Sequence, residues 1–230
     1  MREIVLDTET TGFRHEVDDR IVEIGAVELF NHLPTGRVYH QYVNPERDMP
    51  DGAFQVHGLS REFLSDKPVF AEIAQAFLDF VGEAKMVIHN AGFDVPFLNS
   101  ELRRLKLPQL PMTQAIDTLA IARKRFPGSP ASLDALCRRF GIDNSLREKH
   151  GALLDSEILA EVYLELIGGR QPDFGLSSGG SGRSGGDQAA DWRPRPRPEP
   201  LPPRITQEEA AAHAAFVDSL GDGAIWKKFG

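Results

Sequence analysis

The chain of 230 residues contains a single cysteine, Cys137. One cysteine excludes an internal disulfide framework and a zinc site built from cysteines. No stretch approaches the ~20 consecutive apolar residues that are needed to cross a bilayer. The opening residues, MREIVLDTETTG, lack the basic and apolar segments of a secretory signal. We therefore expect a cytoplasmic protein.

The chain also has fewer basic than acidic residues. It contains 26 Lys and Arg and 34 Asp and Glu residues, which gives a net charge of −8. This balance argues against a stand-alone nucleic-acid binder that works by releasing counterions from phosphates. If the protein acts on DNA or RNA, metal ions or a partner must offset the repulsion. The apolar fraction of 41% and charged fraction of 26% are typical of a globular protein.

The composition changes sharply near residue 170. Residues 1–169 alternate apolar runs with turn signals, as a folded domain does. Residues 170–204 hold seven of the 16 prolines and few aliphatic side chains, which predicts a disordered linker. Order is expected to return in residues 205–230, where Thr206 and Glu209 form a capping-box pattern before a short helix to about residue 220.

The fold class predicted for residues 1–169 is α/β, with helices packed on a mixed sheet. Three strands come first, at 2–9, 20–30 and 37–43, and the short connections between them indicate an antiparallel start. Helices and strands then alternate. The expected helices are 68–83, 93–105, 118–126, 132–140 and 152–167, and the expected later strands are 86–89 and a short one that ends near residue 117.

Four acidic residues lie at strand ends or helix starts. Asp7 and Glu9 are two residues apart at the end of the first strand, so their side chains point to the same face. Asp94 begins a helix and leans towards the apolar face that holds Phe97 and Leu98. Each feature alone is also compatible with ordinary solvated acids or with a helix first turn.

Asp155 is the most informative of the four. It precedes Ile158 and Leu159 on the apolar face of its helix, where an ionised carboxylate is costly unless it is paired or bound to a metal. No Lys or Arg lies at helical spacing on that face, and the alternative to a paired or metal-bound carboxylate is a rim position at the surface. His150 lies five residues earlier, a separation of ~140° on a helix, and is expected on the preceding loop beside the carboxylate.

Together these residues predict a metal-dependent site. Ligands that are all oxygen suit hard cations such as Mg²⁺ or Mn²⁺. Four carboxylates suit two such ions, which assist phosphoryl displacement by activating water and stabilising the leaving oxygen. A histidine with a near-neutral pKa can accept the proton of that water.

Three segments, LDTETTG, HNAGFDVPFLN and HGALLD, resemble the motifs of the exonuclease superfamily that has four acidic metal ligands and a histidine base. The resemblance implies a ribonuclease-H-like fold. The connecting segments VHGLSREFLSDKPVFAEIA and SLDALCRRFGIDNS are similar to the epsilon subunits of bacterial DNA polymerase III, the proofreading 3′→5′ exonucleases of the replisome. The resemblance covers about residues 1–169 and resumes in the C-terminal segment.

The resemblance implies roles for individual residues. Two Mg²⁺ or Mn²⁺ ions are expected on Asp7, Glu9, Asp94 and Asp155, with His150 as the general base. The residues expected to contact the 3′ end of the DNA are Asp7, Glu9, His57 and Asp155. On its own, His57 also reads as a turn histidine before Gly58. A substrate-contacting glutamate of the family is absent near Asp51, Gly52 and Gln55.

The resemblance also implies two protein partners. QPDFGL at 171–176, with Gln171, Phe174 and Leu176, is similar to a sliding-clamp-binding motif. The alternative is that Phe174 and Leu176 pack on the last helix of the domain. Residues 205–230 are similar to the segment that binds the alpha subunit of DNA polymerase III, and their apolar anchors are Phe216, Leu220, Trp226 and Phe229.

Two alternatives remain open at this point. The chain could be a single-strand RNA-trimming exonuclease of the same superfamily, although such an enzyme needs no aromatic C-terminal anchor. It could also be a non-catalytic adaptor between polymerase and clamp, although all four acids and the histidine are present.

Overall fold

A computed structural model describes residues 1–145, 147, 149–168 and 205–221 and divides the chain into two units, Met1–Leu176 and Ser177–Gly230. The first unit is built on a five-stranded sheet in the order β3-β2-β1-β4-β5. β1 (Arg2–Thr10), β2 (Ile21–Phe30) and β3 (Leu33–Tyr42) form an antiparallel meander, and β4 (Lys85–Ile88) and β5 (Ala115–Asp117) extend it in parallel with β1.

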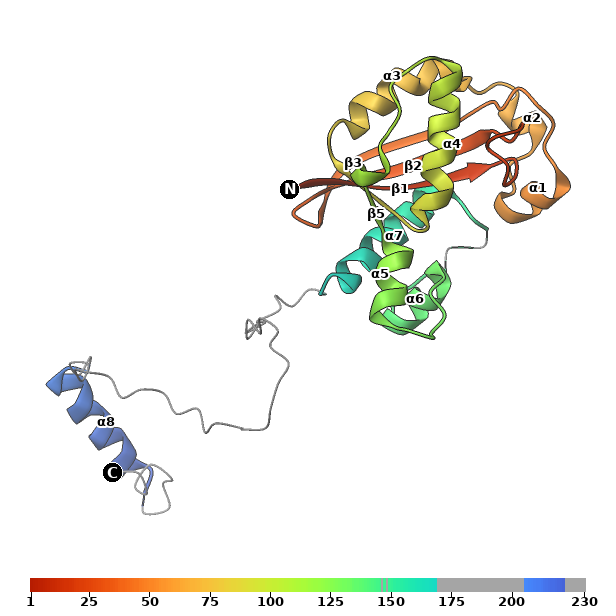
Figure 1. The fold of residues 1–230 in the computed structure, drawn as a ribbon. Helices are drawn as coiled ribbons and strands as arrows, with labels where there is room; N and C mark the ends of the chain where they lie inside the picture. Colours follow the sequence, from red (N-terminus) through yellow and green to blue (C-terminus); the bar gives the residue numbers. More distant parts are fainter. Residues whose placement is uncertain (146, 148, 169–204, 222–230) are drawn as a thin grey trace, which may run out of the picture. The chain divides into compact units, whose positions relative to one another are not determined.

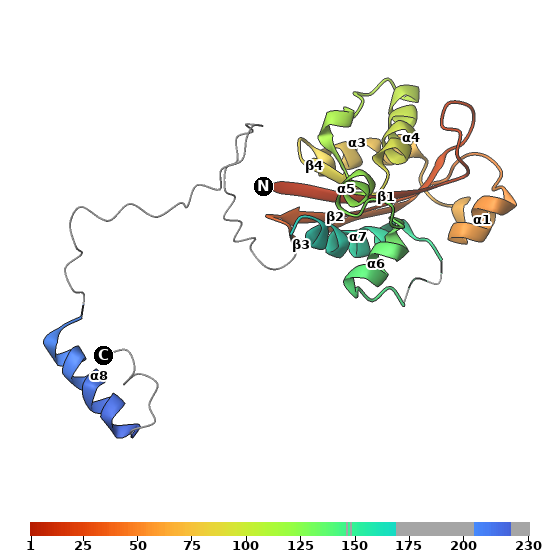
Figure 2. The ribbon, with the colours of Figure 1, turned by 60° about the horizontal axis from the view of Figure 1, so that its bottom comes forward.

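Helices cover both faces of this sheet, as the two ribbon views show (Figures 1 and 2). Ile4 and Leu6 of β1 pack against α3 (Phe70–Val81) and α4 (Ala91–Arg104) on one face. Val5 points to the other face, into the core formed with α5 (Thr118–Arg125), α6 (Leu133–Phe140) and α7 (Ala152–Leu166). The predicted α/β mixed sheet is therefore confirmed.

Some elements differ from the sequence expectation. β3 begins at Leu33, because Asn31 and His32, both with positive φ, complete a two-residue hairpin turn. Three short helices were not predicted: α1 (Asp51–His57), α2 (Arg61–Leu64) and η1 (Met112–Gln114). They are too short to show an apolar periodicity of helical spacing.

α7 lies unusually close to β2 at Gly25. A Cβ atom built on Gly25 would lie 2.1 Å from the backbone nitrogen of Leu153 and 2.2 Å from the carbonyl carbon of Ala152. The hydroxyl of Ser156 donates to the carbonyl oxygen of Gly25 over 2.9 Å. Because Asp7 pairs with Gly25 in the sheet, this contact places the first turn of α7 beside the end of β1.

The second unit contains one described helix, α8 (Gln207–Ser219), with the predicted capping box between Thr206 and Glu209. The Thr206 hydroxyl accepts from the Glu209 backbone N–H, and the Glu209 carboxylate accepts from the Thr206 backbone N–H. No residue of α8 is buried, and Phe216 and Leu220 are exposed. The predicted linker at 170–204, with Gln171, Phe174 and Leu176, and the anchors Trp226 and Phe229 lie outside the described residues.

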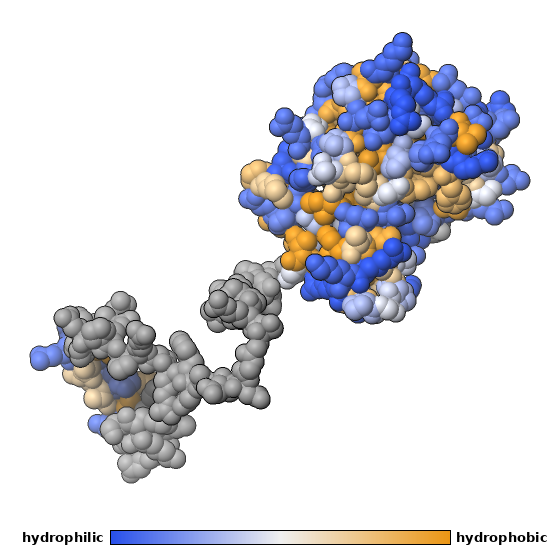
Figure 3. All heavy atoms as spheres, in the orientation of Figure 1, coloured by the Kyte–Doolittle hydropathy of each residue, from blue (hydrophilic) through white to orange (hydrophobic). Residues whose placement is uncertain are grey.

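The outer surface of the first unit is mostly hydrophilic on the face drawn in Figure 3. Among the described residues, no helix has the length and apolar character that a membrane span requires.

Candidate active site

The end of β1 supplies two carboxylates to one side of the sheet. Asp7 and Glu9 alternate with Thr8 along the strand, so they share the face of Val5, on which α7 packs. Glu9 is 8% exposed and Asp7 is half-buried. Both carboxylates are thus held at fixed positions by a central strand of the sheet.

Asp94 reaches the same strand from the first turn of α4. Its carboxylate oxygen Oδ1 accepts from the backbone N–H of Thr8 over 3.1 Å and from the Thr8 hydroxyl over 2.6 Å. The side chain is buried, as its lean towards Phe97 and Leu98 predicts. Thr8 therefore fixes Asp94 next to Asp7 and Glu9.

Asp155 lies in the first turn of α7 and is buried at 3% exposure. Its basic partner comes from outside the helix. Arg147, on the loop before α7, donates from Nε to Oδ1 over 2.5 Å and from Nη2 to Oδ2 over 2.8 Å. An analysis of helical spacing could not find this partner, because Arg147 is not on the helix.

His150 lies on the same loop, one residue before Gly151, which caps α7. Its ring atom Nδ1 is 2.8 Å from Nη2 of Arg147 and 3.5 Å from Oδ2 of Asp155. The side chain is half exposed. This is the predicted position, beside the carboxylate and off the helix.

The residues meet in one cleft of about 1020 Å³. Its lining includes Asp7, Glu9, Asp94, Asp155, His150 and His57. Potential ligand atoms of Glu9, His150 and Asp155 lie within 4.8 Å of one another, close enough to share a metal ion. Segments that are far apart in the sequence thus supply one acidic site.

The electrostatics of the cleft are those of carboxylates that lack sufficient positive charge. Burial, followed by repulsion from Asp155, raises the pKa of Glu9 from 4.5 to about 8. Burial raises the pKa of Asp94 to about 7, and burial with repulsion from Asp94 and Glu9 raises that of Asp7 well above its ordinary value. For Asp155 burial acts in the same direction, but His150 and Arg147 hold its pKa below the ordinary value.

His57 ends α1 and is buried at the wall of the cleft, so it is not a turn residue. Its Nδ1 accepts from the backbone N–H of Leu59 over 3.0 Å, which leaves the proton of the neutral ring on Nε2. Among the described residues Nε2 forms no hydrogen bond of ordinary geometry, although the backbone of Thr10 lies close enough to act on the pKa of the ring. Burial lowers the pKa of His57 and favours this neutral form. Gly52 also lines the cleft, near the position where the family glutamate is missing.

Three of the cleft residues that sequence reasoning missed bear on its chemistry. Thr8 could have been predicted from the alternation of side chains along β1, which points it away from Asp7 and Glu9 and towards α4. Arg147 has no local signal. Phe13, which follows the glycine of the first motif, lines the cleft at 85% exposure and lies edge-on to Phe93, with 6.2 Å between ring centroids.

This fold and its acidic cleft define a nuclease of the exonuclease class. The family model described as Exonuclease matches residues 4–163. Among solved structures, the nuclease domain of 3′hExo, a DEDDh family member bound to rAMP, has a TM-score of 0.61 at 21% identity, with 72% of this chain and 91% of that chain covered. Exonuclease X in complex with 5′ overhanging duplex DNA has a TM-score of 0.56 at 24% identity, with 72% and 90% covered. These likenesses confirm the ribonuclease-H-like exonuclease fold.

Curated relatives define the family more narrowly. The DNA polymerase III subunit epsilon of Escherichia coli K12 is 44% identical over 237 residues, which cover 98% of this chain and 97% of the relative. The subunit of the same name from Rickettsia felis is 56% identical over 177 residues, 76% of this chain and 77% of the relative. The chain therefore belongs to the DNA polymerase III subunit epsilon family of proofreading 3′→5′ exonucleases.

Proposed function

We propose that this chain hydrolyses the 3′-terminal nucleotide of a mispaired DNA strand, as the proofreading subunit of DNA polymerase III, with two Mg²⁺ or Mn²⁺ ions. The observation that carries the proposal is the meeting of four carboxylates from β1, α4 and α7 in one cleft. Similarity to the relative from Escherichia coli extends over 98% of the chain, which favours this function over RNA trimming.

The donor set fits divalent ions of this kind. Asp7, Glu9, Asp94 and Asp155 offer carboxylate oxygens, the ligands that Mg²⁺ and Mn²⁺ prefer. The raised pKa values of Asp7, Glu9 and Asp94 reflect buried negative charge that nearby cations would stabilise. When bound, the ions would activate water and stabilise the charge of the leaving 3′ oxygen. They would also offset part of the net charge of −8 in an enzyme that acts on DNA.

The side chains around the acids have distinct roles. His150 lies at the mouth of the cleft, half exposed, where its ring can accept a proton from water and pass it to solvent. His57 lies at the wall of the cleft with its Nε2–H buried, and a small rotation of the ring would let this group donate to an oxygen of the terminal nucleotide. Phe13 offers an exposed ring on which an unpaired base can stack without regard to its identity.

Selectivity for a mispaired end follows from the cost of strand separation. A mismatched terminus unpairs more cheaply than a matched one, so it reaches a single-strand site more often. The cleft then needs no means of reading the base, and stacking on Phe13 is consistent with that.

The C-terminal unit is proposed to hold the enzyme on the polymerase. α8 buries none of its own residues, and the exposed apolar side chains of Phe216 near its C-terminal end and of Leu220 just after it are suited to a groove on a partner protein. The polymerase alpha subunit is the proposed partner of residues 205–230, with Trp226 and Phe229 as further anchors. The sliding clamp is the proposed partner of residues 171–176, with Gln171, Phe174 and Leu176. Tethering raises the local concentration of the active site near a frayed primer end.

The test is nuclease activity on a 5′-labelled primer with a mismatched 3′ end, in Mg²⁺ and in EDTA. Asp7→Ala should abolish cleavage in Mg²⁺, because the strand loses a ligand at the centre of the cluster. Asp79→Ala, a matched change of an exposed acid on α3, should leave cleavage unchanged. Wild-type activity that persists in EDTA, or in the Asp7→Ala variant, would contradict the proposed mechanism.

A further inference from the structure

Arg147 lies in the middle of the acidic cleft, although it is neither a nucleophile nor a metal ligand. Its side chain is only 8% exposed. The guanidinium engages both carboxylate oxygens of Asp155, an oxygen of Asp134 and the ring of His150. Such a concentration of contacts on one loop arginine calls for an explanation beyond holding the loop.

The charge of Arg147 does what a bound cation would do. Its guanidinium forms two hydrogen bonds of 2.5 and 2.8 Å with Asp155, inside the cleft that Asp7 and Glu9 also line. A planar guanidinium that donates two hydrogen bonds to one carboxylate forms a strong, bidentate ion pair. A divalent ion that binds Asp155 must therefore displace a pair already formed and must tolerate a nearby positive charge.

Asp134 is a second carboxylate partner for Arg147. Nη1 of Arg147 donates to Oδ1 of Asp134 over 2.7 Å, and the amide of Asn144 donates to the same oxygen over 3.0 Å. The Asp134 side chain is 45% exposed, so a charge pair there is less costly than inside the cleft. The guanidinium can lose its bonds to Asp155 and stay neutralised.

The contact with His150 links this exchange to the proposed base. An arginine N–H can only donate, so the 2.8 Å contact with Nη2 is a hydrogen bond in the tautomer of His150 that has its proton on Nε2, whereas a proton on Nδ1 would point to Asp155 instead. In the tautomer with its proton on Nε2, the one lone pair of the ring that could accept a proton from water is already in use.

We propose that Arg147 is an internal counter-ion of the cleft, which neutralises Asp155 and occupies His150 until a divalent cation takes its place and Arg147 turns to Asp134. This inference rests on the proposed metal-dependent function. It makes the metal-free enzyme stable at the expense of metal affinity, and it frees the base only when the site is loaded.

The experiment measures Mn²⁺ affinity by titration calorimetry on the full chain, without substrate. Arg147→Gln removes the competing charge and should tighten Mn²⁺ binding about tenfold, which corresponds to about 1.4 kcal/mol. Arg147→Lys keeps the charge and should stay within about threefold of wild type. Arg138→Gln removes an exposed arginine of α6 and should leave the affinity unchanged, which controls for net charge.

A double-mutant cycle tests the role of Asp134. Asp134→Asn should weaken Mn²⁺ binding in the wild-type background, because Arg147 then has Asp155 as its remaining carboxylate partner. The same change should have little effect in the Arg147→Gln background. An equal effect in both backgrounds would show that Asp134 acts by its charge alone and would overturn the exchange.

The outcomes separate this inference from the proposed function. Wild-type protein that binds no Mn²⁺ would refute the metal site itself. Wild-type protein that binds Mn²⁺, with Arg147→Gln binding it equally or more weakly, would overturn the counter-ion role and leave the metal site standing. If Arg147→Gln does not fold, the Mn²⁺ affinity of Asp134→Asn tests the inference instead. Tighter or unchanged Mn²⁺ binding by Asp134→Asn would contradict the exchange.

Discussion

Replacing Glu9 by glutamine should stabilise the metal-free protein at alkaline pH. Glu9 is 8% exposed, and burial with repulsion from Asp155 raises its pKa from 4.5 to about 8. A carboxyl whose pKa is higher in the folded state than in the unfolded state costs stability whenever the unfolded state is ionised. The cost therefore begins near pH 4.5, grows as the pH rises, and is complete above about pH 8.

The size of the effect follows from that shift. At about 1.4 kcal/mol for each pKa unit, ionised Glu9 costs the fold up to about 5 kcal/mol above pH 8. A buried glutamine amide has its own desolvation cost of roughly 1–3 kcal/mol. We expect Glu9→Gln to raise the free energy of unfolding by about 2–4 kcal/mol at pH 8.5 in EDTA. At pH 5 ionised Glu9 costs less than about 1 kcal/mol, so the same change should give no gain or a loss of up to about 2 kcal/mol.

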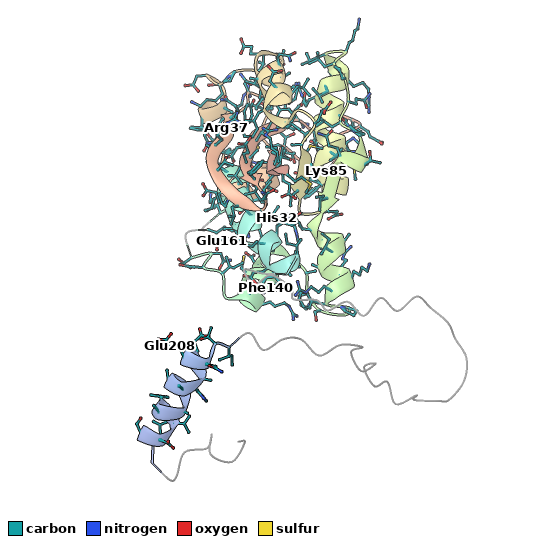
Figure 4. All side chains as sticks on the ribbon, turned by 90° about the vertical axis from the view of Figure 1, so that its left-hand side faces the viewer. His32, Arg37, Lys85, Phe140, Glu161 and Glu208 are labelled. Atoms are coloured by element: carbon teal, nitrogen blue, oxygen red, sulfur yellow. The ribbon has the colours of Figure 1, made fainter. Side chains whose placement is uncertain are left out.

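Urea denaturation followed by circular dichroism, at pH 5, 7 and 8.5, measures this difference directly. Glu161→Gln is the matched control, because Glu161 is exposed on α7 and its replacement should change stability little at any of these pH values (Figure 4). Adding Mn²⁺ should stabilise wild type more than Glu9→Gln, which lacks one ligand. A Glu9→Gln variant that is equally or less stable than wild type at pH 8.5 in EDTA would refute the reasoning.

Three further changes test the scaffold and the tail. Gly25→Ala should cost several kcal/mol of stability and most of the activity, because the added Cβ would overlap the backbone of α7. Thermal melting measures the loss of stability. Gly92→Ala is the control, because a Cβ there meets no atom within 4 Å, and it should melt like wild type. Thr8→Val removes the hydroxyl bonded to Asp94 and should cost about 1 kcal/mol in urea denaturation and reduce kcat, with unaltered kcat counting against the positioning role of Thr8. Deleting residues 205–230 should leave exonuclease activity intact and abolish co-purification with the polymerase alpha subunit, whereas continued co-purification would exclude the tail as the anchor.

Periodicity predicted most of the fold correctly. The alternation of apolar residues in β1 and the i, i+3, i+4 pattern of α3 are local signals, and both elements lie within two residues of their expected bounds. α1 was not predicted, because its seven residues, DGAFQVH, contain one buried side chain, His57. A helix that buries so little leaves no apolar stripe in the sequence.

The site residues that lie on strands and helices could be predicted from the sequence, and the one on the loop before α7 could not. Asp155 is recognisable because a carboxylate on an apolar helix face is costly. Arg147 is eight residues earlier, in a segment without periodicity, and only the folded chain shows that its guanidinium reaches Asp155. Gly25 had a signal that can be used, because a glycine inside a strand often marks a close backbone approach.

The central claim is that four carboxylates hold divalent cations where the 3′ end of DNA is cleaved. The most direct test is a crystal soaked with Mn²⁺ and a nucleoside monophosphate, measured at the manganese absorption edge. The account predicts two anomalous peaks ligated by oxygens of Asp7, Glu9, Asp94 and Asp155, with the phosphate of the nucleotide beside them. Manganese bound elsewhere, or an acidic cleft without an anomalous peak in a crystal that binds the nucleotide, would contradict it.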